Sequence, residues 1–276
     1  MMRNRLVVAG SCAATLSIVG RMASRRAIAT SAVLRSTQPP PPASLGTWAE
    51  LRARLLRVDA CALCDGSGKA ARVVETVRPL NSGYQMVGRA YTVELVPGDF
   101  LTNLVALEAA AAADVLMIDA GFREEEDKRS WPLNGGMFGE LLAAEAERKG
   151  LAGVVIDGNC RDTPMTRTFS IPIYSRGFHP NAGTAQKLGK TQQDVKMGCA
   201  VVQHGDVVFG DDDGVVVASM AELEEWLPKA EAIVSMESAI LAKIRNEGRS
   251  LIDMTSYYEH VKELKAGKES ALGFNL

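Results

Sequence analysis

The sequence is poor in aromatic residues and has no hydrophobic run long enough to span a bilayer. Aromatic side chains make up 5% of its 276 residues, although hydrophobic residues as a whole make up 47%. The apolar stretch at residues 6–20 contains Ser11, Thr15 and Ser17 and is too short for a membrane helix. We therefore expect no membrane association. We expect one large domain whose core consists of small aliphatic side chains in closely packed α/β layers.

Two nucleotide-binding motifs are also missing, the glycine-rich dinucleotide fingerprint and the P-loop. The net charge is −2, but six of the 31 basic residues lie in residues 1–48, where there is no Asp or Glu. From residue 49 onward, 25 basic residues therefore stand against 33 acidic ones. A body with a charge of about −8 lacks the clustered Lys and Arg that phosphate neutralisation requires, so we expect no nucleic-acid partner.

The first 44 residues do not have the composition of a folded segment. They are rich in Arg, Ser, Thr and Ala and contain no acidic residue, as in a mitochondrial transit peptide. A chloroplast address has the same general chemistry, and a disordered basic arm is the simpler alternative. The proline run at 39–42 predicts a stiff linker. We interpret residues 1–44 as a transit peptide with a Pro-rich linker, residues 45–276 as the folded domain, and the protein as mitochondrial, in the matrix.

The five cysteines form no regular framework, which favours a reducing compartment and free thiols. Cys61 and Cys64 form a CxxC pair, but the sequence has no second CxxC and no histidine near this one. This favours two half-buried thiols one helical turn apart over a redox or metal pair. The histidines lack metal-ligand spacing and are interpreted as structural or surface residues: His179, His204 and His260.

The hydrophobic pattern predicts strands that alternate with helices and then a run of short strands. The expected helices cover residues 46–64, 101–113, 135–150 and 220–246, with further helix in 251–276. The expected strands cover residues 86–95, 114–119, 152–157, 171–174, 200–202, 207–209 and 215–217. This order predicts a three-layer α/β domain with a mixed sheet.

Two of these helices carry a more detailed expectation. In the Ala-rich helix 101–113, the side chains of Leu104, Leu107 and Ala111 are expected on one face. The last long helix contains Pro228, so it is either one helix or two with a break at that residue.

The most informative stretch is the glycine-rich segment at residues 135–139, which leads through Glu140 into a predicted helix. Such a turn leaves backbone N–H groups unpaired and directed at whatever lies in front of the helix. Leu141 and Leu142 lie in the first helical turn and can donate these N–H groups. The segment is therefore interpreted as a device that binds a carboxylate.

Arg161 and Asp162 follow the predicted strand at 152–157, and strand ends beside helix starts are where α/β proteins place ligands. The guanidinium of Arg161 suits a carboxylate with an adjacent carbonyl, and the carboxylate of Asp162 suits Mg²⁺ or Mn²⁺. Cleavage of a C–C bond beside a 2-oxo acid places negative charge on the ketone oxygen, which an arginine and a metal stabilise. The simpler alternative is an ion pair at the surface end of a strand.

These residues and their order resemble the RraA-like family, which includes the class II 4-hydroxy-4-methyl-2-oxoglutarate aldolases. The similarity runs over nearly all of residues 50–250. Besides the glycine-rich segment and the Arg-Asp pair, it includes the segments at 87–93, 114–119, 150–162, 171–177 and 204–217. The resemblance implies an RraA-like swivelling β/β/α domain with a mixed sheet, assembled as trimers or hexamers with active sites between subunits.

The resemblance also implies roles for individual residues. The position of Asp162 holds the divalent metal, and that of Arg161 contacts the pyruvyl carboxylate and carbonyl. The backbone amides at Leu141 and Leu142, next to Gly139, bind the carboxylate. Glu140 is expected to order the metal-bound waters, although many members have Asp there.

Three further acidic or basic features are weaker. A glutamate from a neighbouring subunit's C-terminal helix approaches the site in the aldolases, and Glu237 is its best match here; a solvated helix face is the alternative. The acidic segment 211–213 favours a turn over a metal cluster. Arg176 follows a short strand and is expected near the edge of the pocket. The charged segment 121–130 is expected to be a surface loop.

Two functions follow from the resemblance. The first is metal-dependent cleavage of 4-hydroxy-4-methyl-2-oxoglutarate to pyruvate, with decarboxylation of oxaloacetate through the same enolate. The second is a non-catalytic protein that binds and regulates an RNA-processing or other partner, as some members of the family do. The intact glycine-rich turn and Arg161–Asp162 pair favour the enzyme.

Overall fold

The computed structural model describes residues 41–122 and 134–275. Nearly all of the predicted transit peptide and most of the predicted charged loop at 121–130 lie outside this part of the chain, so both stay predictions. The described chain begins at the short 3₁₀ helix η1 (Ala43–Leu45), close to the predicted start of the domain. In the described residues, no helix is both long and apolar enough to cross a membrane.

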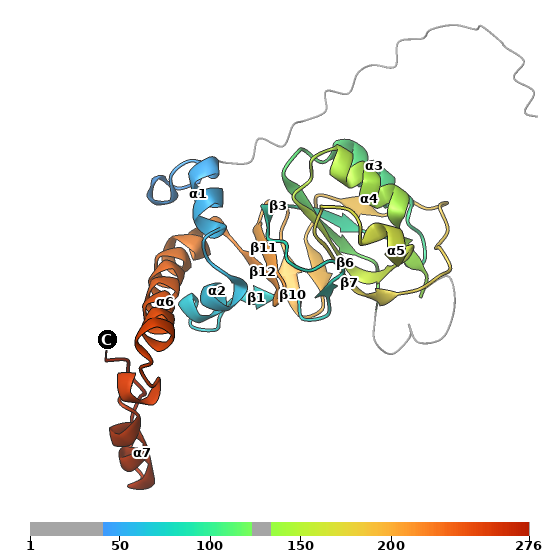
Figure 1. The fold of residues 1–276 in the computed structure, drawn as a ribbon. Helices are drawn as coiled ribbons and strands as arrows, with labels where there is room; N and C mark the ends of the chain where they lie inside the picture. Colours follow the sequence, from blue (N-terminus) through green and yellow to red (C-terminus); the bar gives the residue numbers. More distant parts are fainter. Residues whose placement is uncertain (1–40, 123–133, 276) are drawn as a thin grey trace, which may run out of the picture. The chain divides into compact units, whose positions relative to one another are not determined.

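The described residues form a ten-stranded mixed sheet and a separate two-stranded hairpin (Figure 1). The main path of the sheet runs β1-β12-β11-β3-β4-β6-β7-β2, with β5 paired to β6 and β8 paired to β3. The strands on the main path are β1 (Arg72–Val73), β2 (Arg78–Pro79), β3 (Met86–Glu94), β4 (Asp114–Asp119), β6 (Gly153–Cys160), β7 (Ile173–Phe178), β11 (Val207–Asp211) and β12 (Gly214–Ala218). The remaining strands are β5 (Gly136–Phe138), β8 (Lys190–Thr191) and the hairpin strands β9 (Val195–Met197) and β10 (Ala200–Val202).

The centre of the sheet is parallel and its flanks are antiparallel. β3 pairs in parallel with β4, β4 with β6, and β6 with β7. β11 and β12 extend the sheet in antiparallel fashion on one side, and β2 closes the other. The predicted α/β class with a mixed sheet is therefore confirmed. The parallel strands bring the residues that follow β4 and β6 to one edge of the sheet.

The two faces of the sheet are covered differently, and β3 shows this directly. Tyr91 and Val93 join the core under the helices α3 (Leu101–Ala109) and α4 (Glu140–Arg148). Ala90, the residue before Tyr91, faces the other way and joins a core on the opposite face that includes the β9–β10 hairpin. A third core lies between β11–β12 and the helices α1 (Trp48–Leu55), α2 (Ala60–Gly66) and α6 (Met220–Glu247).

The predicted helix at 46–64 is wrong in one respect, because it consists of two helices. α1 starts at a capping box, in which the Thr47 hydroxyl accepts from the Glu50 N–H and the Glu50 carboxylate accepts from the Thr47 N–H. α2 has its own N-cap, since Asp59 accepts a hydrogen bond of 2.7 Å from the Ala62 N–H. The side chain of Asp59 therefore starts a new helix where the apolar spacing alone predicts continuation.

The predicted face of the helix at 101–113 is also wrong. α3 ends at Ala109, and the side chain of Leu104 is 47% exposed while that of Leu107 is 2% exposed. The buried face instead includes the polar residues Thr102 and Asn103. In an Ala-rich helix the apolar pattern does not show which face is buried, because alanine occurs on both buried and exposed faces.

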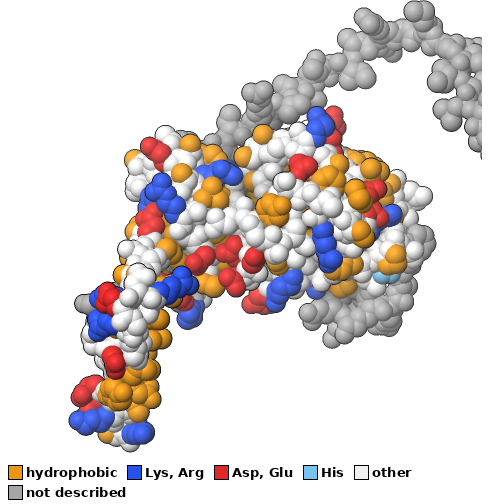
Figure 2. All heavy atoms as spheres, in the orientation of Figure 1, with side chains coloured by type: hydrophobic (Ala, Val, Ile, Leu, Met, Phe, Trp, Pro, Cys, Tyr) orange, Lys and Arg blue, Asp and Glu red, His pale blue; other side chains and the backbone are white. Residues whose placement is uncertain are grey.

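The C-terminal part of the chain is one long helix and a short extension. α6 continues through Pro228 without a break, and Trp226, Leu227 and Ala230 are buried in the core beside α2. The 3₁₀ helix η2 (Ile252–Met254) and the helix α7 (Tyr257–Lys265) follow. Hydrophobic side chains gather on this extension (Figure 2), and the large exposed ones are Leu251, Ile252, Tyr257, Tyr258, Leu264, Leu272 and Phe274.

The different burial of two leucines on α3 gives a matched stability test. Leu107→Ala should lower the free energy of unfolding by about 2–5 kcal/mol, because it leaves a cavity in a closely packed core. Leu104→Ala, on the same helix, should lower it by less than about 1 kcal/mol, because its side chain is half in solvent. Urea unfolding of both variants at one protein concentration measures the difference, and equal losses would contradict the observed orientation of α3.

Candidate active site

Arg161 and Asp162 follow the last residue of β6 and lie beside the start of α4. Asp162 has a left-handed backbone conformation, with φ of 54°, and precedes the one-turn helix α5 (Thr163–Thr166). A hydroxyl within α5 stabilises this turn. Thr166 Oγ1 donates to the carbonyl oxygens of Arg161 (3.1 Å) and Asp162 (2.9 Å). Asp is one of the few residues that tolerate this conformation, so the turn holds both side chains at the edge of the sheet.

The glycine-rich segment packs directly against this pair. It forms the short strand β5, which the sequence pattern does not predict, and then Gly139 as the N-cap of α4. A Cβ on Gly139 would lie 2.5 Å from Asp162 Oδ2 and 2.9 Å from Arg161 Cγ. A Cβ on Gly136 would lie 2.9 Å from Arg161 Cβ. These glycines are required because the backbone approaches the Arg-Asp pair too closely for any side chain.

The start of α4 presents backbone donors to the same point. Gly139 gives no side-chain cap, and the Glu140 N–H lies 3.5 Å from Asp162 Oδ2. The N–H groups of Leu141 and Leu142 belong to the first turn, which has no carbonyl partners within the helix. The side chain of Leu141 is 80% exposed, whereas that of Leu142 is buried. The structure thus brings together Gly139, Glu140, the two leucines and the Arg-Asp pair, as the sequence predicts.

Two buried amides that the sequence pattern does not single out hold this arrangement. Asn103 on α3 is fully buried, and its Nδ2 donates to the Met137 carbonyl at 2.9 Å. Asn159 on β6 donates to the carbonyl and the side-chain oxygen of Asn134. An amide on the buried side of an apolar helix or strand is the only sequence signal that could have identified them.

The contact between Arg161 and Asp162 uses only one nitrogen of the guanidinium. Arg161 Nε donates to both carboxylate oxygens of Asp162, at 3.1 and 3.0 Å. The two side chains are 35% and 31% exposed, so the pair is open to small molecules. Only Nε is used in this contact, and the outer guanidinium nitrogens remain able to bind a carboxylate or carbonyl oxygen.

The side chains present fit a hard divalent cation. Asp162 supplies a carboxylate 3.5 Å from the backbone nitrogen of Glu140, whose own side chain is a second carboxylate, and Mg²⁺ is commonly held by one or two carboxylates with several waters. Within residues 41–122 and 134–275, no three His, Cys, Asp or Glu side chains converge on one point. An ion here would therefore keep a largely water-filled coordination sphere.

Glu237 is not brought to this site within one chain. It is exposed on α6, which packs against α2 in a different core from that of α4. Its predicted role requires a second copy of the chain and stays a prediction.

The comparison with known proteins identifies the family. The family model RraA-like, described as Aldolase/RraA, matches residues 60–217. The chain belongs to the RraA-like family. This confirms the resemblance that rests on the glycine-rich segment and the Arg-Asp pair, and it confirms the swivelling β/β/α fold.

The individual relatives include a protein named as an aldolase, an uncharacterised protein and a member of a family of RNase inhibitors. A protein of Halalkalibacterium halodurans that is provisionally named 4-hydroxy-4-methyl-2-oxoglutarate aldolase is 30% identical over 169 residues, covering 61% of this chain and 76% of that protein. An uncharacterised protein of Methanocaldococcus jannaschii is 29% identical over 193 residues, covering 70% of this chain and 87% of that protein. The crystal structure of Streptomyces coelicolor RraAS2, described as an unusual member of the RNase ES inhibitor RraA protein family, is similar with a TM-score of 0.61 at 27% identity, covering 74% of this chain and 98% of that one.

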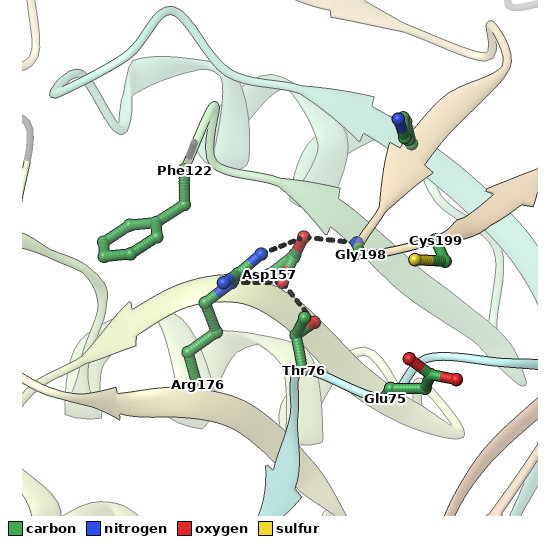
Figure 3. Close-up of a pocket in the computed structure, with 8 residues that line it drawn as sticks. Glu75, Thr76, Phe122, Asp157, Arg176, Gly198 and Cys199 are labelled. Carbon is green, nitrogen blue, oxygen red and sulfur yellow. Dashed lines mark hydrogen bonds and ion pairs between the residues drawn. The ribbon is translucent and has the colours of Figure 1, made fainter. Parts of the chain in front are cut away.

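A second hollow, of about 280 Å³, lies near this edge of the sheet on the side of the β9–β10 hairpin (Figure 3). At its floor, Arg176 of β7 binds Asp157 of β6 through Nε (2.5 Å) and Nη2 (3.0 Å). The Thr76 hydroxyl (2.5 Å) and the Gly198 N–H (2.8 Å) donate to the same carboxylate. Nε and Nη2 of Arg176, the Thr76 hydroxyl and the Gly198 N–H thus have partners within the protein. Arg176 thus lines this hollow, whose lining includes neither Arg161 nor Asp162.

The Asp157–Arg176 pair should be essential for stability. The Asp157 side chain is 1% exposed and that of Arg176 is 16% exposed, so Asp157→Ala would leave a largely desolvated guanidinium without its partner. We expect a loss of about 3–5 kcal/mol in the free energy of unfolding. As a control, Glu94→Ala breaks the exposed pair with Lys190 and should cost less than about 1 kcal/mol. Chemical unfolding of both variants tests this, and a loss as small for Asp157→Ala as for the control would contradict it.

The features outside the site agree with their predicted structural roles. Asp211 is buried in the turn between β11 and β12 and accepts from the Ala60 N–H at 2.8 Å, so the acidic segment is a turn as predicted. Burial lowers the pKa of His204, whose ring packs edge-on against Tyr91. Cys61 and Cys64 are free thiols in α2 as predicted, but only Cys64 is half-buried, and the prediction is wrong for Cys61, which is exposed.

The CxxC thiols should be poor nucleophiles. Burial and the carboxylate of Asp213 raise the pKa of Cys61 to about 11, so the reactive thiolate is scarce at neutral pH. Alkylation of Cys61 by iodoacetamide at pH 8 should be about 100-fold slower than expected for a thiol of pKa 9, and should accelerate until the pH approaches 11. Mass spectrometry of the alkylated peptide measures the rate, and rapid labelling at pH 7 would contradict the prediction.

Proposed function

We propose that the protein is a divalent-metal-dependent lyase for small 2-oxo acids. The reaction is retro-aldol cleavage of 4-hydroxy-4-methyl-2-oxoglutarate to pyruvate, or decarboxylation of oxaloacetate. The observation that carries the proposal is the close packing of Gly139 and the α4 N-terminus on Arg161 and Asp162. This packing supports the proposal, because the backbone donors would bind a carboxylate and the guanidinium would stabilise an oxyanion beside it.

Each element has a separate task in this reaction. The N–H groups of Leu141 and Leu142 bind the carboxylate of the substrate and fix its orientation. When the C–C bond breaks, negative charge moves to the 2-oxo oxygen, and the outer nitrogens of Arg161, which the contact with Asp162 does not use, would stabilise it. Both proposed substrates form the same enolate, so one site serves either reaction.

Asp162 would hold the Mg²⁺ or Mn²⁺ ion, and Glu140 would orient the water molecules around it. A bound divalent cation supplies a Lewis acid that strengthens the stabilisation of the enolate oxygen. Glu140 has one methylene more than aspartate, so it reaches further from the start of α4.

The active assembly would be a trimer or hexamer in which Glu237 of a neighbouring copy completes the site. Its exposure on α6 is compatible with that role. We also propose that residues 1–44 direct the protein into mitochondria, which fractionation of cells that express the full chain would test.

The main experiment measures pyruvate release by the full chain with Mg²⁺ or Mn²⁺. Each of the two substrates is tested, with and without EDTA. Asp162→Asn should abolish metal-dependent release, because it removes the charge but keeps the shape and the tolerance for a left-handed backbone. Asp162→Ala should do the same. Arg161→Lys should lose about 100-fold or more, because lysine cannot replace the fork of donors.

Two controls make this test decisive. Arg148→Lys changes an exposed arginine at the far end of α4, which pairs with Glu145, and should leave the rate unchanged. Binding of Mn²⁺ measured by electron paramagnetic resonance should fall in Asp162→Asn even without substrate. Release that is insensitive to EDTA and to Asp162 would overturn the proposal.

The alternative function is regulation of a partner protein without catalysis. It is favoured by the similarity to RraAS2, whose family is described as RNase ES inhibitors. A well-folded protein that releases no pyruvate from either substrate and binds no metal would support this alternative.

A further inference from the structure

A second arginine lies close to the candidate active site. Arg167 caps the C-terminal end of α5, one short helical turn after Asp162. Its guanidinium carbon lies 5.6 Å from the centre of the Phe178 ring, a distance typical of a cation–π contact. Phe178 pairs with Cys160 in the parallel sheet, directly before Arg161. Arg167 therefore follows the Arg-Asp pair at the end of α5. Phe178, whose ring it contacts, lies at the end of β7 beside the end of β6.

The charge of Arg167 is available for a ligand. Among the described residues no carboxylate forms an ion pair with it, and its contact with Phe178 does not neutralise it. Arg161, in contrast, is already bound to Asp162. In the proposed reaction the N–H groups of α4 bind the first carboxylate, and the Arg161–Asp162 pair has no net positive charge to attract a second one.

The surroundings of Arg167 suit the distal end of an extended ligand. Phe178 and Met165 are 51% and 53% exposed, and the side chain of Leu141 is 80% exposed on the other side of the pair. An arginine that lies on an aromatic ring loses less freedom when it binds, because the ring already restricts its rotamers. The site thus has a polar centre at Arg161–Asp162, an apolar rim, and a second cation beyond the rim.

We propose that Arg167, held on Phe178, binds the distal carboxylate of the substrate and makes the site selective for dicarboxylic over monocarboxylic 2-oxo acids. The inference rests on the proposed function for the site itself. Both substrates proposed above carry two carboxylates, and the inference goes beyond them by naming the residue that selects such substrates.

The test compares two stable compounds of the same chain length. 2-Oxoglutarate has a carboxylate at the distal end, and 2-oxopentanoate has a methyl group there. Calorimetric titration of the full chain with each compound, in the presence of Mg²⁺, should show tighter binding of 2-oxoglutarate. Arg167→Gln should weaken the binding of 2-oxoglutarate by about 10- to 100-fold and leave that of 2-oxopentanoate unchanged, because only the former loses a charged hydrogen bond.

Matched variants separate this role from a general effect of charge. Arg167→Lys keeps the charge and should recover part of the selectivity. Phe178→Leu keeps an apolar side chain but removes the ring, and should weaken 2-oxoglutarate binding by a smaller factor than Arg167→Gln does. Arg148→Gln removes an exposed positive charge at the other end of α4 and should change neither affinity. Arg167 is exposed, so its substitution should not affect folding.

The outcomes distinguish this inference from the proposed function. If the wild type binds both compounds and Arg167→Gln weakens both equally, or weakens neither, the selectivity role of Arg167 is wrong while the 2-oxo acid site stands. If the wild type binds neither compound and releases no pyruvate, the proposed function fails and the inference fails with it. Loss of 2-oxoglutarate binding alone supports the role.

Discussion

The buried carboxylate of Asp157 is the contact on which the edge of the sheet depends. It accepts from Arg176, Thr76 and the Gly198 N–H, and so joins β6 to β7, to the segment before β2 and to the β9–β10 hairpin. The register between β6 and β7 shifts immediately after Ile156, so β6 ends as an irregular strand. A charge at this depth is tolerated only because all its partners are present. The irregular end then carries the chain into the turn that presents the site.

The candidate site is a consequence of how closely two backbone segments approach each other there. β5 continues the sheet beside the end of β6, and Gly139 leaves no room for a side chain between α4 and the Arg-Asp pair. The same close approach directs the unpaired N–H groups of α4 and the guanidinium of Arg161 to one point. In the proposed reaction one short contact would serve both to bind a carboxylate and to stabilise an oxyanion, and the buried amide of Asn103 keeps that contact in place.

Much of the fold was predictable because its central strands have distinctive sequences. β4 is a continuous apolar run that matches its predicted bounds, and the short strands β10, β11 and β12 lie where the valine-rich segments predict them. The errors occurred where apolar spacing carries too little information. Asp59 divides a predicted helix by capping its second half, and alanines hide which face of α3 is buried. β5 and β8 are too short to show any periodicity.

The sequence by itself determined the family, the mixed α/β class and the residues of the candidate site, because the glycine-rich segment and the Arg-Asp pair are local in the chain and chemically distinctive. Only the tertiary structure decided which of the other polar residues lie nearby. Arg167 and Phe178 come from different elements, and their contact depends on the pairing of β6 with β7. Arg176 was expected at the edge of the pocket, but the sheet pairs its side chain with Asp157 in a hollow whose lining does not include Arg161. Side-chain direction in a strand depends on register, and register is fixed by long-range pairing that no local pattern encodes.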